Sequence, residues 1–211
     1  CDHWENCRTL RRMAASFARR DLLRLAAAAP VALGLNSALS TVLAAQAEAA
    51  PLGVLLDYAA GVIPAADIKA SGAIGAIRYV SDRRPGGQWM LGKPIELPEA
   101  RDLYKSGLKI VSCYQYGKQD SADWLGGQPA GVQHAKRGWQ LHLAAGGSYG
   151  VPIYASIDDD PSLEQYKQQV APYLRGWESV LGHNRTGIYA NSKTIEWAIQ
   201  DGLGSYFWQH N

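Results

Sequence analysis

Three consecutive aspartates, Asp158, Asp159 and Asp160, end the apolar segment 153–157. Adjacent like charges repel each other and lose hydration beside an apolar segment, so the position is unfavourable unless the carboxylates have a use. Strand side chains alternate, so we expect Asp158 and Asp160 to share one side and Asp159 to take the other. Paired carboxylates can cleave glycosidic bonds: one acid protonates the leaving oxygen, and another carboxylate stabilises the cation-like transition state or activates water. Crowding of carboxylates generally keeps one of them protonated as the acid.

Two other roles for these aspartates stay open at this point. Asp159 or Asp160 precedes Pro161, with Glu164 in the next turn, so one of them could cap the N-terminus of the following helix. A divalent cation held by the carboxylates is the second alternative. A single capping aspartate would leave the other two free for chemistry.

Further polar and aromatic residues follow the ends of other apolar segments. Asp57 ends the first of them in the same sense as Asp158, so three carboxylates would converge. Arg78 could hydrogen-bond a carboxylate, either Asp57 or a substrate acid, or it could hold a structural ion pair. Gln115 could bind a sugar hydroxyl or cap a strand. Aromatic rings can stack on sugars, although most are expected to be packing residues. The predicted substrate-binding residues are Tyr58, Arg78, Tyr114, Gln115, Tyr189, Asn191 and Trp208.

The residues after position 50 alternate between strand-like and helix-like segments. The pattern predicts strands at 51–58, 73–80, 108–116, 151–158, 186–191 and 205–211. It predicts helices at 64–70, 97–107, 129–145, 162–181 and 192–201. Strands separated by helices imply right-handed βαβ units and a mainly parallel α/β sheet.

Two α/β architectures fit this alternation, an open doubly wound sheet and a TIM (β/α)8 barrel. The first βα turn, LDYAAGVIP, lacks the G-x-G-x-x-G signature of a dinucleotide site, so no cofactor is indicated. In a barrel the carboxyl ends of the strands share one face, which carries the active site. Six strands are visible, and a chain ending in YFWQHN would leave an apolar edge. We therefore predict a TIM-type barrel truncated after about six strands.

Residues 1–50 have the pattern of an export signal. A start at Met13 is followed by adjacent Arg19 and Arg20, a modest apolar stretch and an A-x-A pattern at 47–49. The run resembles a twin-arginine signal peptide. A retained signal anchor and a chance amphipathic helix are the alternatives. The signal predicts a secreted protein, extracellular or cell-wall associated, that meets a membrane only during export.

The predicted domain, residues 51–211, is electrically balanced, with 15 basic and 15 acidic residues. The excess positive charge lies in the leader, so the domain gives no indication of nucleic-acid binding. Cys113 is the one cysteine after position 50, which excludes an internal disulfide and suggests a buried apolar role. The histidines lack zinc-ligand spacing, so no metal is predicted.

A family resemblance rests on six motifs in order: LLDYAAG, AIGAIRYVSD, VSCYQYG, PIYASIDDD, TGIYAN and YFWQH. They resemble the DUF1906 group of glycoside-hydrolase-like domains, in particular its mycobacterial twin-arginine-exported type, over nearly all of residues 52–211. More distantly the plan is similar to glycoside hydrolase family 25, the secreted muramidases. That resemblance implies acids at the ends of the first and fourth strands, at Asp57, Asp158 and Asp160. The family has Glu where this chain has Asp160, which is one methylene shorter.

The sequence therefore predicts a secreted, glycoside-hydrolase-like barrel that hydrolyses O-glycosidic bonds of cell-wall polysaccharide such as peptidoglycan. Asp158 and Asp160 are the expected acid and base or stabiliser, supported by Asp57. Because one fold carries several functions, a non-catalytic glycan-binding or cell-wall regulatory module remains the alternative. A membrane-anchored structural domain, with an uncleaved leader, is a third hypothesis.

Overall fold

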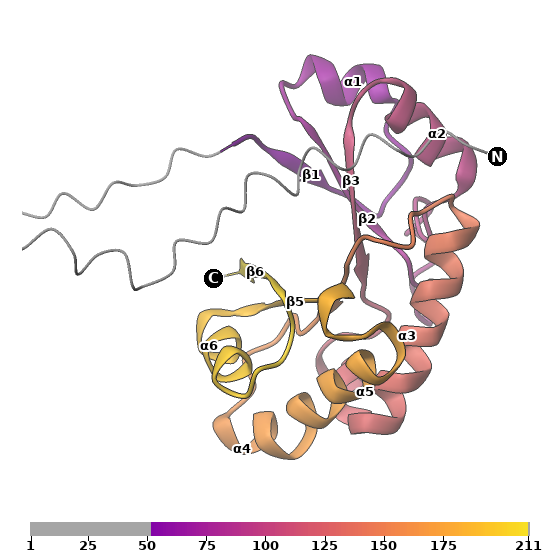
Figure 1. The fold of residues 1–211 in the computed structure, drawn as a ribbon. Coiled ribbons are helices and arrows are strands. Elements are labelled where there is room, and N and C mark those ends of the chain that lie inside the picture. Colours follow the sequence, from indigo (N-terminus) through magenta and orange to yellow (C-terminus); the bar gives the residue numbers. More distant parts are fainter. Residues whose placement is uncertain (1–51, 211) are drawn as a thin grey trace, which may run out of the picture. The chain divides into compact units, whose positions relative to one another are not determined.

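The computed structural model describes residues 52–210, and the predicted signal peptide therefore lies outside the described residues. Six strands form a single parallel sheet in chain order (Figure 1). The strands are β1 (Leu55–Asp57), β2 (Gly75–Tyr79), β3 (Lys109–Tyr114), β4 (Ile153–Ser156), β5 (Thr186–Asn191) and β6 (Tyr206–His210).

Helices connect the strands. The α-helices are α1 (Ala65–Ala70), α2 (Leu97–Lys105), α3 (Gly127–Ala144), α4 (Leu163–Gln165), α5 (Ala171–Leu181) and α6 (Ser192–Gln200). A π-helical turn, η5 (Tyr166–Val170), joins α4 to α5, so the predicted helix at 162–181 is one interrupted helix. Short 3-10 turns are η3 (Gln119–Ser121), η4 (Asp123–Gly126) and η6 (His183–Arg185).

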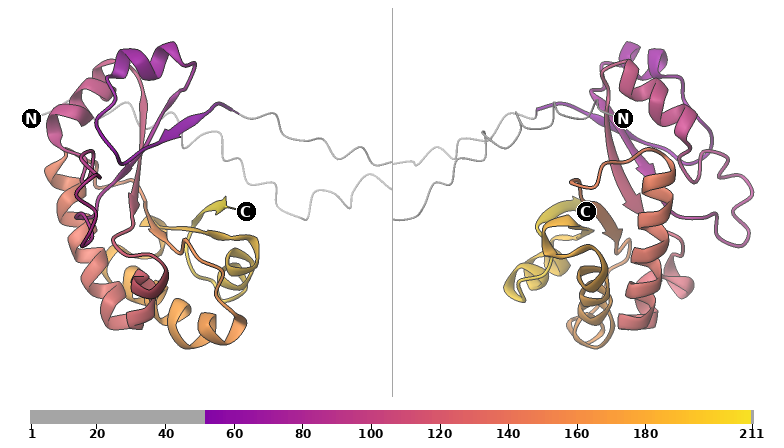
Figure 2. Two further views of the ribbon diagram at one scale, coloured as in Figure 1. Left: turned by 180° about the vertical axis from the view of Figure 1, so that it is seen from behind. Right: turned by 45° about the vertical axis from the view of Figure 1, so that its right-hand side comes forward.

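The sheet curls instead of lying flat, as the two views in Figure 2 show. Every strand pairs with its sequence neighbours, from β1 with β2 to β5 with β6. A doubly wound sheet would reverse its strand order at a switch point, whereas sequential order is that of a barrel. The predicted fold class is therefore confirmed as a curled, TIM-type half-barrel of six parallel strands.

Five of the six strands are shorter than the sequence predicts, and two of these differences bear on the acidic residues. β1 occupies Leu55–Asp57 within the predicted 51–58, and β4 ends at Ser156 instead of 158. The aspartates at 158–160 therefore lie in the connection after β4, where strand alternation no longer governs their side chains.

The outer layer is tied together by close contact between α3 and α5, which lie side by side (Figure 1). A Cβ atom at Gly131 would lie 2.1 Å from the Tyr173 carbonyl oxygen, and one at Gly176 would lie 2.5 Å from that of Gln128. Glycine at both positions lets the two helix backbones touch. The close approach fixes the helices over β3 to β5, whose carboxyl ends carry the polar residues described next.

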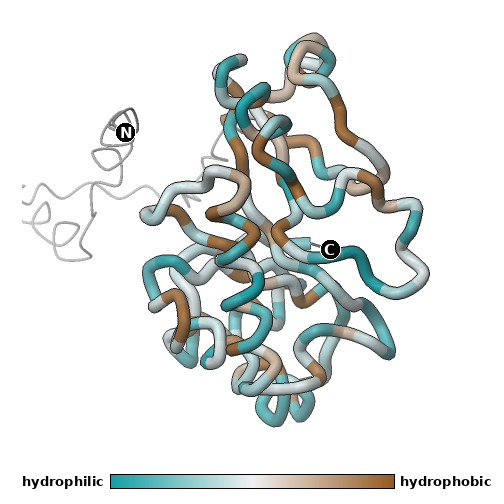
Figure 3. The backbone as a smooth tube through the Cα atoms, turned by 90° about the vertical axis from the view of Figure 1, so that its right-hand side faces the viewer, coloured by the Kyte–Doolittle hydropathy of each residue, from teal (hydrophilic) through white to brown (hydrophobic). Residues whose placement is uncertain are grey.

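The core lies between the sheet and this helical layer. Its largest fully buried apolar side chains include Trp177, Tyr166, Tyr173, Ile68, Leu103, Ile153, Ile157 and Leu174. Figure 3 shows the more hydrophilic stretches of the chain in the outer connections. Within residues 52–210 no helix combines the length and the apolar character needed to span a bilayer.

Candidate active site

Asp158 is the centre of a hydrogen-bonded group at the carboxyl ends of β3, β4 and β5. Its Oδ2 accepts from Gln115 Nε2 at 2.9 Å and from Lys118 Nζ at 2.6 Å. The Tyr189 hydroxyl lies 3.4 Å from Oδ1. The half-buried carboxylate thus meets one full positive charge and two neutral donors, which together fix its position.

Asp57 stands at the end of β1 and accepts a hydrogen bond of 3.1 Å from the Tyr79 hydroxyl. Although the residue is exposed, the surrounding strands displace water, and this partial burial raises the pKa of its carboxyl. The bond from Tyr79 and the charge of Arg78 oppose the rise, while the charge of Asp158 adds to it. The two carboxylates at the ends of β1 and β4 therefore influence each other.

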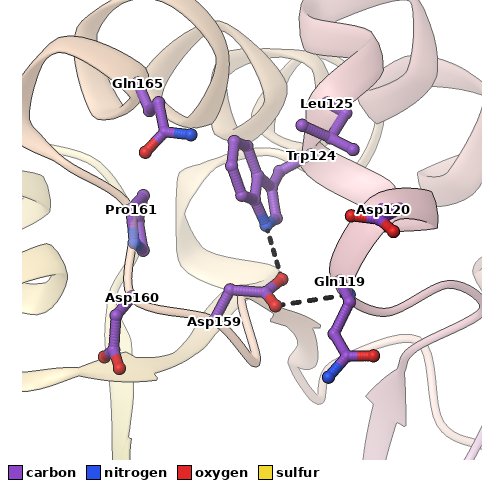
Figure 4. A pocket seen from close by; sticks show the side chains of 8 residues that line it. All are labelled: Gln119, Asp120, Trp124, Leu125, Asp159, Asp160, Pro161 and Gln165. Atoms are coloured by element: carbon purple, nitrogen blue, oxygen red, sulfur yellow. Dashed lines mark hydrogen bonds between the residues drawn. The ribbon is translucent and has the colours of Figure 1, made fainter.

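The other two aspartates line a neighbouring depression of about 360 Å³, and Figure 4 shows the Asp159 carboxylate directed toward Trp124 and Gln119 while that of Asp160 points away from them. Asp159 accepts from Trp124 Nε1 at 3.0 Å and from the Gln119 backbone N–H at 3.3 Å. Asp160 accepts from Asn191 Nδ2 at 2.7 Å. Asp159 and Asp160 line the same hollow, and Asp158 lines another. This differs from the predicted alternation because the strand has already ended.

The capping alternative for the aspartates is wrong. The N-cap of α4 is Ser162, whose hydroxyl accepts from the Gln165 backbone N–H. None of the described residues forms a group of three or more His, Cys, Asp or Glu side chains suited to a metal ion. Asn191, predicted to bind substrate, caps α6 through Oδ1 while its amide holds Asp160.

Arg78 forms a structural ion pair, one of the two roles considered for it, and does not hydrogen-bond Asp57. The side chain is 0% exposed, and its Nε lies 2.6 Å from Glu99 Oε1 on α2. Its guanidinium also donates to the carbonyls of Tyr58 and Gly92. Tyr58 packs its ring 3.9 Å from the Arg78 Cζ and donates to Glu99. Both residues, predicted to bind substrate, instead hold the backbone beside Asp57.

Tyr114 is also placed away from a ligand. It is 3% exposed and packs against His134 and Trp177 in the helical layer. Its predicted stacking role is therefore corrected to core packing, since β3 directs this side chain toward the helices. Tyr189 and Trp208 do lie together, with ring centroids 4.1 Å apart, at the ends of β5 and β6.

A second pocket, of about 180 Å³, opens beside Asp158. Of its lining residues, Gln115 and Asp158 are predicted from the sequence and the rest are not. Tyr79 ends β2, Ala59 lies in the connection after β1 and Lys118 in the connection after β3, and the others come from the long connection after β2. The sequence feature that could have indicated these residues is the presence of Arg and Lys in the glycine- and proline-containing connections that follow the strands. The lining residues not predicted are Ala59, Tyr79, Arg84, Trp89, Met90, Lys93 and Lys118.

Asp123 fixes the loop that carries Gln115 and Lys118. Its carboxylate accepts from the backbone N–H groups of Tyr116 and Gly117, each at 2.8 Å. Burial raises the pKa of Asp123 to about 6, although both backbone hydrogen bonds oppose this rise. It is a positioning residue for the donors around Asp158, and sequence analysis did not identify it.

A half-barrel with acidic side chains at its strand ends defines the class of glycoside-hydrolase-like proteins. The chain belongs to the Rv2525c-like, glycoside hydrolase-like domain family, whose model matches residues 66–211. The predicted resemblance is thereby confirmed.

Relatives at high identity agree with this assignment. The chain is 71% identical over 196 residues to a Mycobacterium tuberculosis protein named "Putative peptidoglycan hydrolase Rv2525c", covering 93% of this chain and 82% of that one. A crystal structure of the Tat-secreted Mycobacterium tuberculosis protein Rv2525c in complex with HEPES superimposes with a TM-score of 0.76 and 76% identity, over 76% of this chain and 80% of that one. An uncharacterized B. stearothermophilus protein shares the fold at 16% identity, with a TM-score of 0.50 over 74% of each chain.

Proposed function

We propose that the protein is a glycoside hydrolase that cleaves O-glycosidic bonds of a cell-wall polysaccharide of the peptidoglycan type. The observation that carries this proposal is the contrast between Asp57 and Asp158. Partial burial raises the pKa of Asp57, which favours its protonated form. Asp158 is instead held by the Lys118 ammonium and two further hydrogen-bond donors. Two carboxyl groups in such different environments suit an acid and a base.

The roles follow from these environments. Asp57 would protonate the leaving glycosidic oxygen, and Asp158 would stabilise the cation-like transition state or activate water. Asp160, the third carboxylate predicted from the sequence, accepts a hydrogen bond from Asn191 and has no step in this proposal. The sequence predicts the general acid to be Asp158 or Asp160, whereas this proposal assigns that role to Asp57.

Substrate and location are proposed from the relatives together with the predicted leader. The relative at 71% identity carries the name of a peptidoglycan hydrolase, and the solved protein at 76% identity is described as Tat-secreted. The twin-arginine pattern at Arg19 and Arg20 supports the same export route here.

Incubation of the purified protein with peptidoglycan tests the proposal. We expect new reducing ends from wild type and a loss of at least about a hundredfold in Asp57→Asn and Asp158→Asn. Asp67→Asn, an exposed aspartate on α1, is the matched control and should keep full activity. Wild type that releases no reducing ends from peptidoglycan would contradict hydrolysis.

A glycan-binding module on the same fold is the second candidate. The bond between Asp160 and Asn191 favours it, because it engages one of the three predicted carboxylates, and Asp160 lines a different hollow from Asp158. Retained co-sedimentation with peptidoglycan, without reducing ends, would support this function over hydrolysis. Asp160→Asn separates the two further, since a hydrolase that uses Asp57 and Asp158 should tolerate this change.

A further inference from the structure

The pocket of about 180 Å³ beside Asp158 contains more positive than negative side chains. Three cations line it, Arg84, Lys93 and Lys118, against the single carboxylate of Asp158. Lys118 is paired with that carboxylate at 2.6 Å. The two remaining cations, Lys93 and Arg84, define what we call the basic wall of the pocket, and their charges are not balanced by Asp158.

Lys93 is a buried cation. The residue is 2% exposed, and its ammonium donates to the Gln115 carbonyl and lies 4.5 Å from the centroid of the Tyr79 ring. No ion pair formed within residues 52–210 includes Lys93. An ammonium carries three N–H donors, so a single carbonyl leaves donors for a ligand in the pocket.

Arg84 adds to the positive charge at this wall. Its charge, acting with the larger effect of burial, helps lower the pKa of Lys93 to about 8, so the two cations disfavour each other. Within the described part of the chain the Arg84 guanidinium forms no ion pair. The charges of Asp123 and Asp57 act on the pKa of Lys93 in the opposite sense, but neither forms an ion pair with Lys93 within residues 52–210, so an anion that contacts both cations would be favourable. A carboxylate suits a guanidinium especially well, since it can accept two parallel hydrogen bonds.

We propose that this pocket is a subsite for a carboxylate carried by the glycan, held by Arg84 and Lys93 next to the bond on which Asp158 acts. The location beside a scissile bond rests on the proposed function, and the subsite narrows the substrate to an acidic glycan. Trp89, 56% exposed at the pocket, offers a ring on which the sugar can stack. In peptidoglycan the carboxylate can belong to the lactyl group of a muramic acid without its peptide, or to the peptide itself.

Binding of monosaccharide probes tests the subsite. We expect wild type, titrated by NMR, to bind N-acetylmuramic acid about tenfold more tightly than its lactyl carboxamide, because charged groups strengthen hydrogen bonds. N-acetylmuramyl-L-alanyl-D-isoglutamine and its carboxamide form the second pair of probes. A preference for the acid in the first pair identifies the lactyl carboxylate, and a preference in the second pair alone identifies the peptide carboxylate.

Two variants locate the preference at this wall. Arg84→Gln and Lys93→Met should each reduce it to about twofold or less, while Arg101→Gln, an exposed arginine on α2, should leave it unchanged. Equal binding of acid and carboxamide in both pairs, or no binding of either at millimolar concentrations, would overturn the proposal. A preference that survives in both Arg84→Gln and Lys93→Met would do the same.

None of these probes contains a bond between two sugars, so the titration does not depend on cleavage. If wild type prefers the acid probe but releases no reducing ends from peptidoglycan, the proposed hydrolase activity is contradicted and the carboxylate subsite is supported. Cleavage without an acid preference would remove the subsite alone.

Discussion

The Lys118 ammonium lies 2.6 Å from Asp158 Oδ2 and links the connection after β3 to the end of β4. Gln115 donates to the same oxygen, whereas among residues 52–210 Oδ1 has only the long 3.4 Å contact with the Tyr189 hydroxyl. The carboxylate is therefore anchored through one oxygen and presents the other. This asymmetry suits a group that must approach a sugar or a water molecule in a fixed direction.

Lys118→Met tests the anchor. Asp158 would keep Gln115 as its donor but lose the charged one, so we expect hydrolysis of peptidoglycan to fall about ten- to hundredfold. The pair is partly exposed, at 42% and 23% of the two side chains, so the free energy of unfolding should change by less than about 1 kcal/mol. Lys136→Met, an exposed lysine on α3, is the matched control. Equal rates in wild type and Lys118→Met would show that the charge does not position Asp158.

The sequence allowed the fold class and the approximate position of the site to be predicted, because hydrophobic segments ending in polar residues recur through the domain. It did not reveal which neighbour at each strand end faces the site. Successive strand residues point to opposite sides. At the end of β2, Arg78 turns to Glu99 under the helices while Tyr79 reaches Asp57. Arg78 was predicted to bind substrate, whereas the adjacent Tyr79 is the residue that lines the pocket.

The residues contributed by loops could not have been predicted from periodicity. Lys93 and Trp89 reach the pocket through a connection stabilised by backbone hydrogen bonds, such as those of Leu91 and Gly92 with the loop after β1. Such a path has no repeating pattern from which side-chain direction follows. The same reason explains the three aspartates, whose directions differ because β4 ends before them.

Glu99→Gln tests whether the buried ion pair with Arg78 supports the domain. Arg78 is fully buried and would keep its charge without a carboxylate partner, so we expect unfolding in urea to require about 3–5 kcal/mol less free energy. Asp82→Asn breaks an exposed pair with Arg137 of the same 2.6 Å length, and should change stability by less than about 1 kcal/mol. Similar losses in both variants would contradict the importance given to burial.

Asp123 makes stability depend on pH. Because burial raises its pKa to about 6 in the folded protein, above the ordinary 3.8, the folded state binds a proton more tightly than the unfolded state. This contribution is fully present below about pH 4 and is lost as pH rises through 6, by up to about 3 kcal/mol.

Asp123→Asn removes this titration. The difference in unfolding free energy between wild type and variant, measured in urea from pH 4 to 7, isolates Asp123 because the remaining carboxyl groups contribute equally to both proteins. We expect wild type to lose stability relative to the variant across that range. A difference that stays constant with pH would show that Asp123 does not titrate there.

Tyr79→Phe tests the acid role proposed for Asp57. The hydroxyl of Tyr79 donates to Asp57 and lowers the pKa of that carboxyl, while burial raises it. Without the hydroxyl the rise due to burial is less opposed, so the pKa of Asp57 should increase further. A general acid works while protonated, so the alkaline limb of the pH–rate profile on peptidoglycan should move to higher pH. Tyr154→Phe, on β4, is the matched control. A shift of the acidic limb instead would mean that Asp57 acts as a carboxylate, and superimposable profiles would remove Asp57 from the reaction.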